Sequence, residues 1–321
     1  MSLWLSRFRF STSIRQSRSV GRPRLCVEML EAREVPAQYL VLTAADTTAL
    51  TAPSAGNGTA GNPFQVETLR LAIQLANASV GRADTIRFDA GLEDATIFLN
   101  SGNDPLTFEP GAKTTIDGTN LGITVDGLGF ERFERVFNVE AGAKADIKNL
   151  TIQNGLDGGF DSPSGGAGAD PMFDYGGDTF EGFDSPSSGL SAAPITDFGG
   201  GGIYNAGRLT LANVVVTGNR STSNNGGGGG ILNAAGANLI LNDSRVEGNT
   251  ASSFFFGNFL DGGGILNEGT MTIARSTVRD NNASGSGGGI ANIGRLTVTA
   301  STISGNRTEQ FSGYLQSREE S

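Results

Sequence analysis

A repeated spacing of apolar residues constrains the fold of this chain more than any other feature. Four segments carry an apolar residue, a second one two positions later, and a third five positions after that. A spacing of two puts both residues on one face of a strand, whereas a step of five breaks the alternation and requires a bend. The triplets are Leu209-Leu211-Val216, Leu239-Leu241-Val246, Met271-Ile273-Val278 and Leu296-Val298-Ile303, with Ala145-Ile147-Ile152 as a degenerate fifth copy. Each segment therefore predicts two short strands joined by a bend.

Asparagine recurs at two fixed positions of the same repeat. One row lies two residues after an isoleucine that ends a Gly-rich approach, and the other lies three residues after the last apolar residue of each triplet. The first row is Asn205, Asn233, Asn267 and Asn292, and the second row is Asn219, Asn249, Asn281 and Asn306. Asparagine tolerates the left-handed backbone region at sharp corners, and stacked amides bond to one another along a rod. We interpret both rows as structural, with a glycan-binding row as the alternative.

The length of the repeat indicates a solenoid. Successive asparagines of the second row (219 to 249, 249 to 281 and 281 to 306) lie 30, 32 and 25 residues apart. Repeats of this size with Gly/Asn turns are typical of stacked coils, none of which is stable alone. The sequence therefore predicts an all-β fold, a right-handed parallel β-helix over residues 39–306. In this register Asp243 lies opposite Arg275 and Glu247 lies opposite Arg279, about 5 Å apart, which predicts two exposed ion pairs.

One amphipathic helix is predicted ahead of the repeats, over residues 64–79. Val66, Leu69, Ile73 and Ala76 fall on one apolar stripe of that helix. An N-terminal capping helix would cover the open end of the first coil, whose unpaired backbone groups otherwise recruit other chains.

The segment around this helix resembles a known family. TLRLAIQLAN (residues 68–77) is similar to the CSLREAI-x-x-AN element of CSLREA-type β-helix proteins, and ADTIRF (residues 83–88) is similar to their A-D-T-I-x-F strand. Glu67 and Leu71 stand where that family has Cys and Glu. The GGGI…N repeats also resemble those of polymorphic outer-membrane proteins. The resemblance covers about residues 64–306 and implies a pectin-lyase-like architecture and an exported cell-surface protein.

Residues 1–38 are predicted to be a basic leader. Residues 1–27 carry six arginines and no carboxylate, but they lack the apolar core of a signal peptide. A short motif near the end of this segment resembles the LE-x-R-x-x-P leaders of large bacterial surface proteins. Its residues are Leu30, Glu31, Arg33 and Pro36. The motif implies export, and a disordered basic tail is the alternative.

Two insertions and a tail depart from the repeat. Residues 155–200 are rich in Gly, Ser, Pro and Asp. We interpret them as a flexible insertion, and a calcium site formed by their carboxylates is the alternative, although no D-x-D-x-D-G loop occurs. A shorter insertion with residues 254–256 and Phe259 predicts an exposed apolar patch. The polar tail, residues 307–321, either forms an improvised C-terminal cap, or the chain is a fragment of a longer solenoid. An uncapped last coil would be prone to end-to-end association.

Composition excludes several chemistries. Histidine is absent and Cys26 is the only cysteine, which excludes Ser-His-Asp catalysis, His-ligated zinc and an intrachain disulfide. The net charge of −10 argues against a nucleic-acid partner. No run of 18 apolar residues occurs, so no transmembrane segment is predicted. No two carboxylates occupy equivalent positions in neighbouring aligned coils, as hydrolysis by a carboxylate pair would require.

These observations predict an exported, non-enzymatic protein of the cell surface or the extracellular space, with a structural or adhesive role and no cofactor. Its expected partners are extracellular glycans or other surface proteins. A polysaccharide-binding or polysaccharide-cleaving β-helix protein is the alternative, because a fold does not determine a function.

Overall fold

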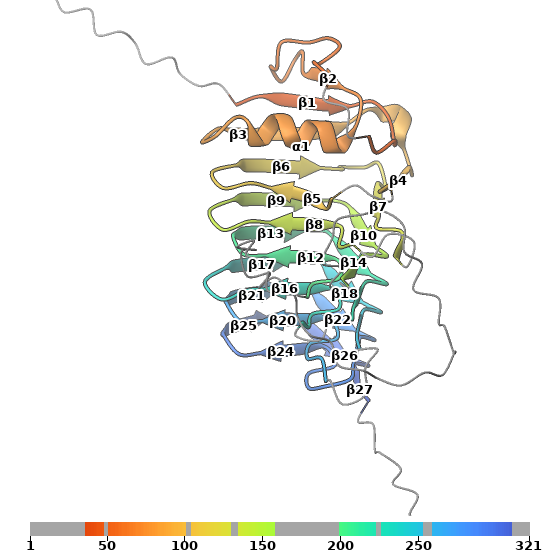
Figure 1. Ribbon diagram of the computed structural model, residues 1–321, viewed down its shortest axis with the longest axis vertical. Helices are drawn as coiled ribbons and strands as arrows, with labels where there is room; N and C mark the ends of the chain where they lie inside the picture. Colours follow the sequence, from red (N-terminus) through yellow and green to blue (C-terminus); the bar gives the residue numbers. More distant parts are fainter. Residues whose placement is uncertain are drawn as a thin grey trace, which may run out of the picture. The chain divides into compact units, whose positions relative to one another are not determined.

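The computed structural model describes residues 36–47, 51–100, 104–129, 134–157, 199–222, 226–252 and 259–309. Within these ranges the chain winds into coils whose short strands pair with the same strands of the next coil, in four all-parallel sheets (Figure 1). The predicted parallel β-helix with one N-terminal helix is confirmed. The leader up to residue 35, the insertion between residues 158 and 198, the three phenylalanines at 254–256 and residues 310–321 lie outside the described residues.

The four sheets are named here by their number of strands, and each is given in its spatial order. The nine-stranded sheet contains β2 (Phe64–Val66), β1 (Gln38–Val41), β3 (Ala83–Phe88), β6 (Lys113–Asp117), β9 (Lys144–Lys148), β13 (Arg208–Ala212), β17 (Asn238–Asn242), β21 (Thr270–Ala274) and β25 (Arg295–Thr299). The seven-stranded sheet contains β4 (Thr96–Phe98), β7 (Thr124–Asp126), β10 (Thr151–Gln153), β14 (Val215–Thr217), β18 (Arg245–Glu247), β22 (Thr277–Arg279) and β26 (Thr302–Ser304). The six-stranded sheet contains β5 (Leu106–Phe108), β8 (Phe137–Val139), β12 (Ile203–Asn205), β16 (Ile231–Asn233), β20 (Ile265–Asn267) and β24 (Ile290–Asn292). The five-stranded sheet contains β11 (Leu156–Asp157), β15 (Arg220–Ser221), β19 (Thr250–Ala251), β23 (Asn282–Ala283) and β27 (Arg307–Thr308).

The register of the strands is the one that the apolar triplets predict. Leu209 pairs with Leu239, and Val216 pairs with Val246; the following coils continue both columns. The degenerate copy also aligns, since Ala145 is the partner of Leu209. These residues alternate with outward-facing ones and form one continuous core inside the coils. A spacing of two and then five thus encodes two strands and the corner between them.

The glycines before each isoleucine allow the coil to close. At Gly228 the φ angle is +65°, a left-handed value that side-chain-bearing residues adopt at a cost. At Gly229 an added Cβ would lie 2.3 Å from Thr250 O of the same coil. The backbone therefore passes against the five-stranded sheet with no room for a side chain, and this packing recurs at Gly201, Gly263 and Gly288.

The N-terminal helix is shorter than the sequence predicts. Helix α1 spans Leu69–Asn77, and Thr68 caps it by accepting a hydrogen bond from Leu71 N. Thr68 itself is extended, with φ −129° and ψ 159°, so the helix cannot continue backwards. Residues 64–66 instead form β2, which pairs with β1. Val66 was therefore wrongly placed on the helix stripe, although it is buried.

Two side chains of α1 fasten the helix to the first coils. The Arg70 guanidinium pairs with both oxygens of Asp46, at 2.6 and 2.9 Å, and donates to Asp104 O. Asn77 Nδ2 donates to Thr107 O, and Asn77 Oδ1 accepts from Glu109 N. These bonds hold the helix beside β5, and its buried apolar residues belong to the core at this end of the stack.

The last described coil, built from β24 to β27, remains open on its outer side. Val298 is 39% exposed and Ile303 is 50% exposed, whereas their counterparts in earlier coils are buried. Ile290 and Leu296 pack against the core but are only partly buried. Residues that are core elsewhere are thus accessible at this end.

Candidate functional site

The two asparagine rows form ladders of side-chain amides along the coils. In the first row Asn205 Nδ2 donates to Asn233 Oδ1 at 2.7 Å, and the same bond repeats to Asn267 at 2.7 Å and to Asn292 at 2.6 Å. In the second row Asn219, Asn249, Asn281 and Asn306 are joined by Nδ2 to Oδ1 bonds of 2.9–3.0 Å. All eight residues are brought into these two ladders, and six of them are buried.

Each side-chain amide of the second row also forms hydrogen bonds with backbone groups. Asn249 Oδ1 accepts from the backbone N–H of Asn219 at 3.0 Å, and Asn249 Nδ2 donates to Val216 O at 3.0 Å. The side chain therefore replaces a backbone partner at a corner where the sheet ladder is interrupted. Buried backbone groups rarely remain unpaired, so an asparagine at this position completes the corner.

The left-handed residues are not the ones that we predicted. None of the eight ladder asparagines has a positive φ angle. The left-handed corner residue precedes each asparagine of the second row, as Gly218, Gly248, Asp280 and Gly305. The ladder asparagines therefore have negative φ angles, and their amides point from coil to coil. In the second row, the glycine or aspartate before each asparagine adopts the left-handed conformation that makes the turn.

A second left-handed corner lies between the nine-stranded and seven-stranded sheets. Its residues are Asn149, Asn213, Asp243, Arg275 and Ala300, with φ between 48° and 58°. Arg275 binds Asp243 through two bonds of 2.8 Å, and Arg279 binds Glu247 at 2.8 Å. Both predicted cross-coil ion pairs are confirmed. The hydrogen bond from Arg275 lowers the pKa of the Asp243 carboxyl below its ordinary value.

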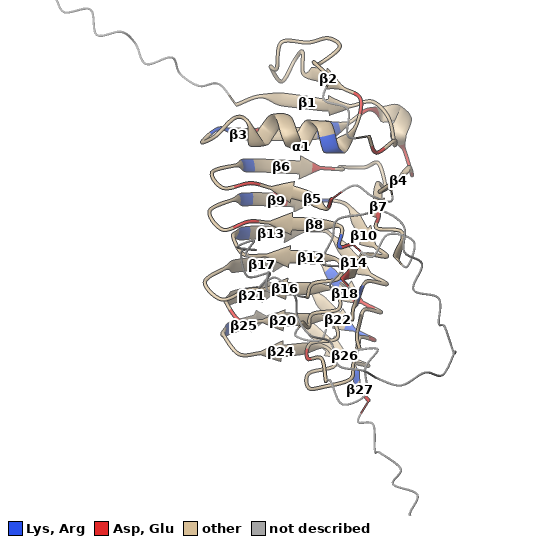
Figure 2. Cartoon of the chain, in the orientation of Figure 1, with Lys and Arg blue, Asp and Glu red and all other residues tan. Residues whose placement is uncertain are grey.

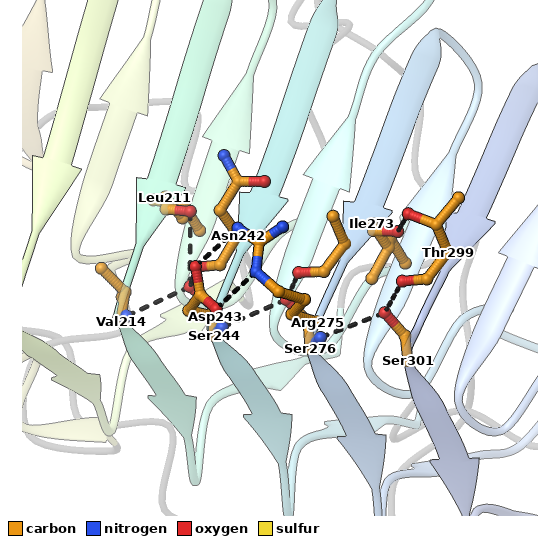
Figure 3. A network of polar contacts seen from close by, with 11 residues as sticks. Leu211, Val214, Asn242, Asp243, Ser244, Ile273, Arg275, Ser276, Thr299 and Ser301 are labelled. Carbon is orange, nitrogen blue, oxygen red and sulfur yellow. Dashed lines mark hydrogen bonds and ion pairs between the residues drawn. The ribbon is translucent and has the colours of Figure 1, made fainter.

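A serine ladder at the same corner was missed by the sequence analysis (Figure 3). Ser244 Oγ accepts from Val214 N, Ser276 Oγ accepts from Ser244 N, and Ser301 Oγ accepts from Ser276 N, at 3.0–3.1 Å. Each of these hydroxyls donates to a carbonyl of its own coil. The signal was available, since serine stands two residues before the last apolar residue in three successive repeats.

Asp157 connects the two ends of the chain that flank the long insertion. Its carboxylate accepts from Gly199 N at 2.5 Å and from Arg135 Nη2 at 2.9 Å. Asp157 and Gly199 are the last and first described residues around the insertion. A single carboxylate thus joins the two ends across the interruption, which lets the five-stranded sheet continue from β11 to β15.

A cleft of about 600 Å³ crosses the corner between the seven-stranded and five-stranded sheets. Phe98 on β4 stands in it with 52% of its surface exposed. Asp126 accepts from Leu128 N, Gln153 Nε2 and Asn154 Nδ2, each at 2.8 Å. These three donors fix the orientation of the Asp126 carboxylate, which is buried at the edge of the cleft. Burial lowers the pKa of the Arg220 guanidinium, which also lines the cleft.

The described residues offer no group of three or more Asp, Glu, His or Cys side chains arranged to hold a metal ion. The carboxylates of the predicted calcium alternative lie outside them. Phe259, at the edge of the shorter insertion, is 57% exposed. No helix in the described ranges is both long and apolar enough to cross a membrane.

The four parallel sheets and the internal amide ladders define a protein of the parallel β-solenoid class. No protein-family model matches the chain. A stretch of 87 residues is 34% identical to Halomucin from Haloquadratum walsbyi (strain DSM 16790 / HBSQ001). The stretch covers 27% of this chain and 1% of Halomucin, so the chain spans a very small part of that relative's length.

Proposed function

We propose that this protein is an exported, non-enzymatic β-helix of the cell surface or the extracellular space, with a structural or adhesive role. The observation that carries the proposal is the use of its recurring polar side chains. The Asn and Ser residues that repeat in register bond to one another from coil to coil, so they stabilise the stack instead of facing a substrate.

The sequence resemblances support the surface location. The LE-x-R-x-x-P motif, the CSLREA-type segment and the GGGI…N repeats all resemble elements of exported proteins. The 34% identity to Halomucin over 87 residues adds to these resemblances. On this basis we propose that the residues ahead of β1 are an export leader; the coils themselves run from Gln38 in β1 to Thr308 in β27, slightly beyond the bounds 39–306 expected from the sequence.

A structural role for the asparagine rows fits their burial. Asn205, Asn233 and Asn267 are 0% exposed, and their amides bond to the next coil. A glycan cannot reach side chains in the interior, so we assign both rows to cohesion of the stack.

A polysaccharide-binding role is the second candidate, and the cleft favours it. Phe98 offers an exposed ring on which a sugar can stack, and Asp126 and Arg220 lie at the same corner. Aromatic faces pack well against the apolar side of a ring.

The test exposes purified protein to a panel of acidic and neutral polysaccharides, with and without calcium. We expect no new reducing ends and no unsaturated sugars. Release of such products that disappears in Asp126→Asn would overturn the non-enzymatic assignment. Binding without cleavage that is lost in Phe98→Ala would favour the second candidate. Protease treatment of intact cells tests the location, and full protection from a protease that cuts the lysed control would contradict surface display.

A further inference from the structure

The outer face of the nine-stranded sheet carries three cations in register. Lys113 on β6 pairs with Lys144 on β9, which pairs with Arg208 on β13. All three side chains are exposed, and Figure 2 shows blue segments at the start of these three strands, one beside the next. Like charges directly opposite each other in neighbouring strands repel. Pairing of the sheet therefore does not explain this row, which we call the cation strip.

The cation strip stands out against the rest of the chain. The net charge is −10 and the chain has only three lysines, Lys113, Lys144 and Lys148, all of which lie on β6 and β9. Among the described residues no carboxylate forms an ion pair with Lys113, Lys144 or Arg208. Lys113 Nζ donates to Gly81 O at 3.2 Å. These charges are thus available to a partner from outside.

A row of hydrogen-bonding groups runs beside the cations. Thr115, Asp146 and Thr210 are register partners of one another on the same outer face, two residues further along each strand. The two threonine hydroxyls can donate to and accept from the hydroxyls of a ligand, and the Asp146 carboxylate can accept from them. The outward positions of β6, β9 and β13 hold no aromatic and no large apolar side chain. The strip therefore lacks a platform for stacking bases and an apolar anchor for a lipid surface.

We propose that the cation strip binds an acidic polysaccharide, a linear polymer with one carboxylate on each sugar, lying across the strands. Successive coils are about 4.8 Å apart, and a sugar ring in an extended chain is of comparable length. Neighbouring carboxylates therefore meet neighbouring cations, while the ring hydroxyls meet Thr115, Asp146 and Thr210. This inference rests on the proposed adhesive role and names the chemistry of its partner.

Two charge-matched triple variants test the strip. Lys113→Gln/Lys144→Gln/Arg208→Gln removes it, and Arg245→Gln/Arg295→Gln/Arg307→Gln removes three exposed arginines that are not neighbours in one sheet. The probe is an oligomer of polygalacturonate, compared with the fully methyl-esterified oligomer that has the same backbone and no charge. Calorimetry at low ionic strength measures the affinity. We expect the strip variant to bind at least about tenfold more weakly, a change of about 1.4 kcal/mol, and the control variant to stay within about twofold of the wild type.

Three results would overturn the inference: equal losses in both variants, equal affinity for the esterified oligomer, or no binding of polygalacturonate by the wild type. Tighter, strip-dependent binding of single-stranded DNA or of anionic lipid vesicles would overturn the assignment to a polysaccharide. Unfolding midpoints establish that both variants fold. If the wild type and the strip variant bind a neutral glycan equally well, the adhesive role stands and the role of the cation strip is wrong. If the strip binds polygalacturonate but the protein is not found at the cell surface, the role of the strip stands and the proposed surface location is wrong.

Discussion

Single residues with left-handed backbone conformation determine where each coil turns. At both corners the chain uses one left-handed residue per coil, and the side chain found there varies from none to a guanidinium. Only glycine, and to a lesser degree asparagine and aspartate, adopts this region readily. Arg275 and Ala300, with φ of 49° and 48°, are held there by their neighbours in the stack.

Replacing Ala300 by glycine should stabilise the protein. Alanine in the left-handed region is strained by about 1–2 kcal/mol, and part of this gain is lost because glycine gains freedom in the unfolded chain. We expect the free energy of unfolding to rise by about 0.5–1 kcal/mol in urea titrations. Ala274→Gly is the control, because Ala274 lies at the end of β21 without a positive φ, and it should lower stability. A loss in both variants would contradict strain at residue 300.

The ion pair at the same corner predicts a small pH dependence. The bond from Arg275 depresses the pKa of Asp243 below its ordinary value of 3.8. A depressed carboxyl pKa in the folded state contributes stability above the unfolded pKa, and the contribution is lost as the pH falls through the folded pKa. The difference in melting temperature between wild type and Asp243→Asn should therefore be constant from neutral pH to about pH 5 and shrink below pH 4. A difference that grows on acidification would contradict this sign. Because both side chains are exposed, the effect should also weaken with salt.

Among the structural elements, the ladders and the sheets hold the coils together in different ways. The sheets pair strands, whereas the Asn and Ser ladders satisfy backbone groups at the corners between strands. A ladder residue therefore contributes to two coils at once. An unpaired buried group costs about 1–3 kcal/mol, which makes interior rungs more sensitive to substitution than exposed asparagines.

Asn249→Ala should be strongly destabilising. It removes the acceptor of Asn219 N and Nδ2 and the donor to Asn281 Oδ1 and Val216 O. We expect a loss of about 2–4 kcal/mol in the free energy of unfolding, measured by urea titration. Asn242→Ala in the same coil is the control, since its side chain faces outward at the end of β17, and it should change stability by less than about 0.5 kcal/mol. Equal effects would show that the ladder bonds add nothing specific.

At the scale of the whole solenoid, the two ends of the stack differ. At the N-terminal end the apolar face of helix α1 is buried in the core, while the last described coil exposes apolar residues that are core elsewhere. The end-to-end association expected from the sequence stays a prediction. An edge of unpaired strands with exposed apolar side chains favours contact with a second copy.

Two charges on the open end should suppress such association. In Val298→Glu/Ile303→Glu both substituted side chains lie at positions that are already 39% and 50% exposed, so the fold should tolerate them. Sedimentation velocity over a range of concentrations should show larger species for the wild type and fewer for the variant. Leu42→Glu/Val80→Glu, exposed apolar residues near the other end, should leave the distribution unchanged. Loss of the larger species in this control instead would contradict association through the last coil.

The coil and its register follow from the amino-acid sequence alone. The two-then-five spacing gives Leu209, Leu211 and Val216 their inward positions, because strand alternation and a corner are local consequences of the chain. The same register brought Arg275 to Asp243 and aligned both asparagine rows. Features that depend on contacts between neighbouring coils could not be predicted in this way. Residues 64–66 follow a helical pattern yet form β2, because β1 offers an edge to pair with. The left-handed residue precedes Asn219, because the amide must reach inward to the next coil. The register also places Lys144 opposite Arg208, whereas Lys113 joins them only through the pairing of β6 with β9, which none of the apolar triplets predicts.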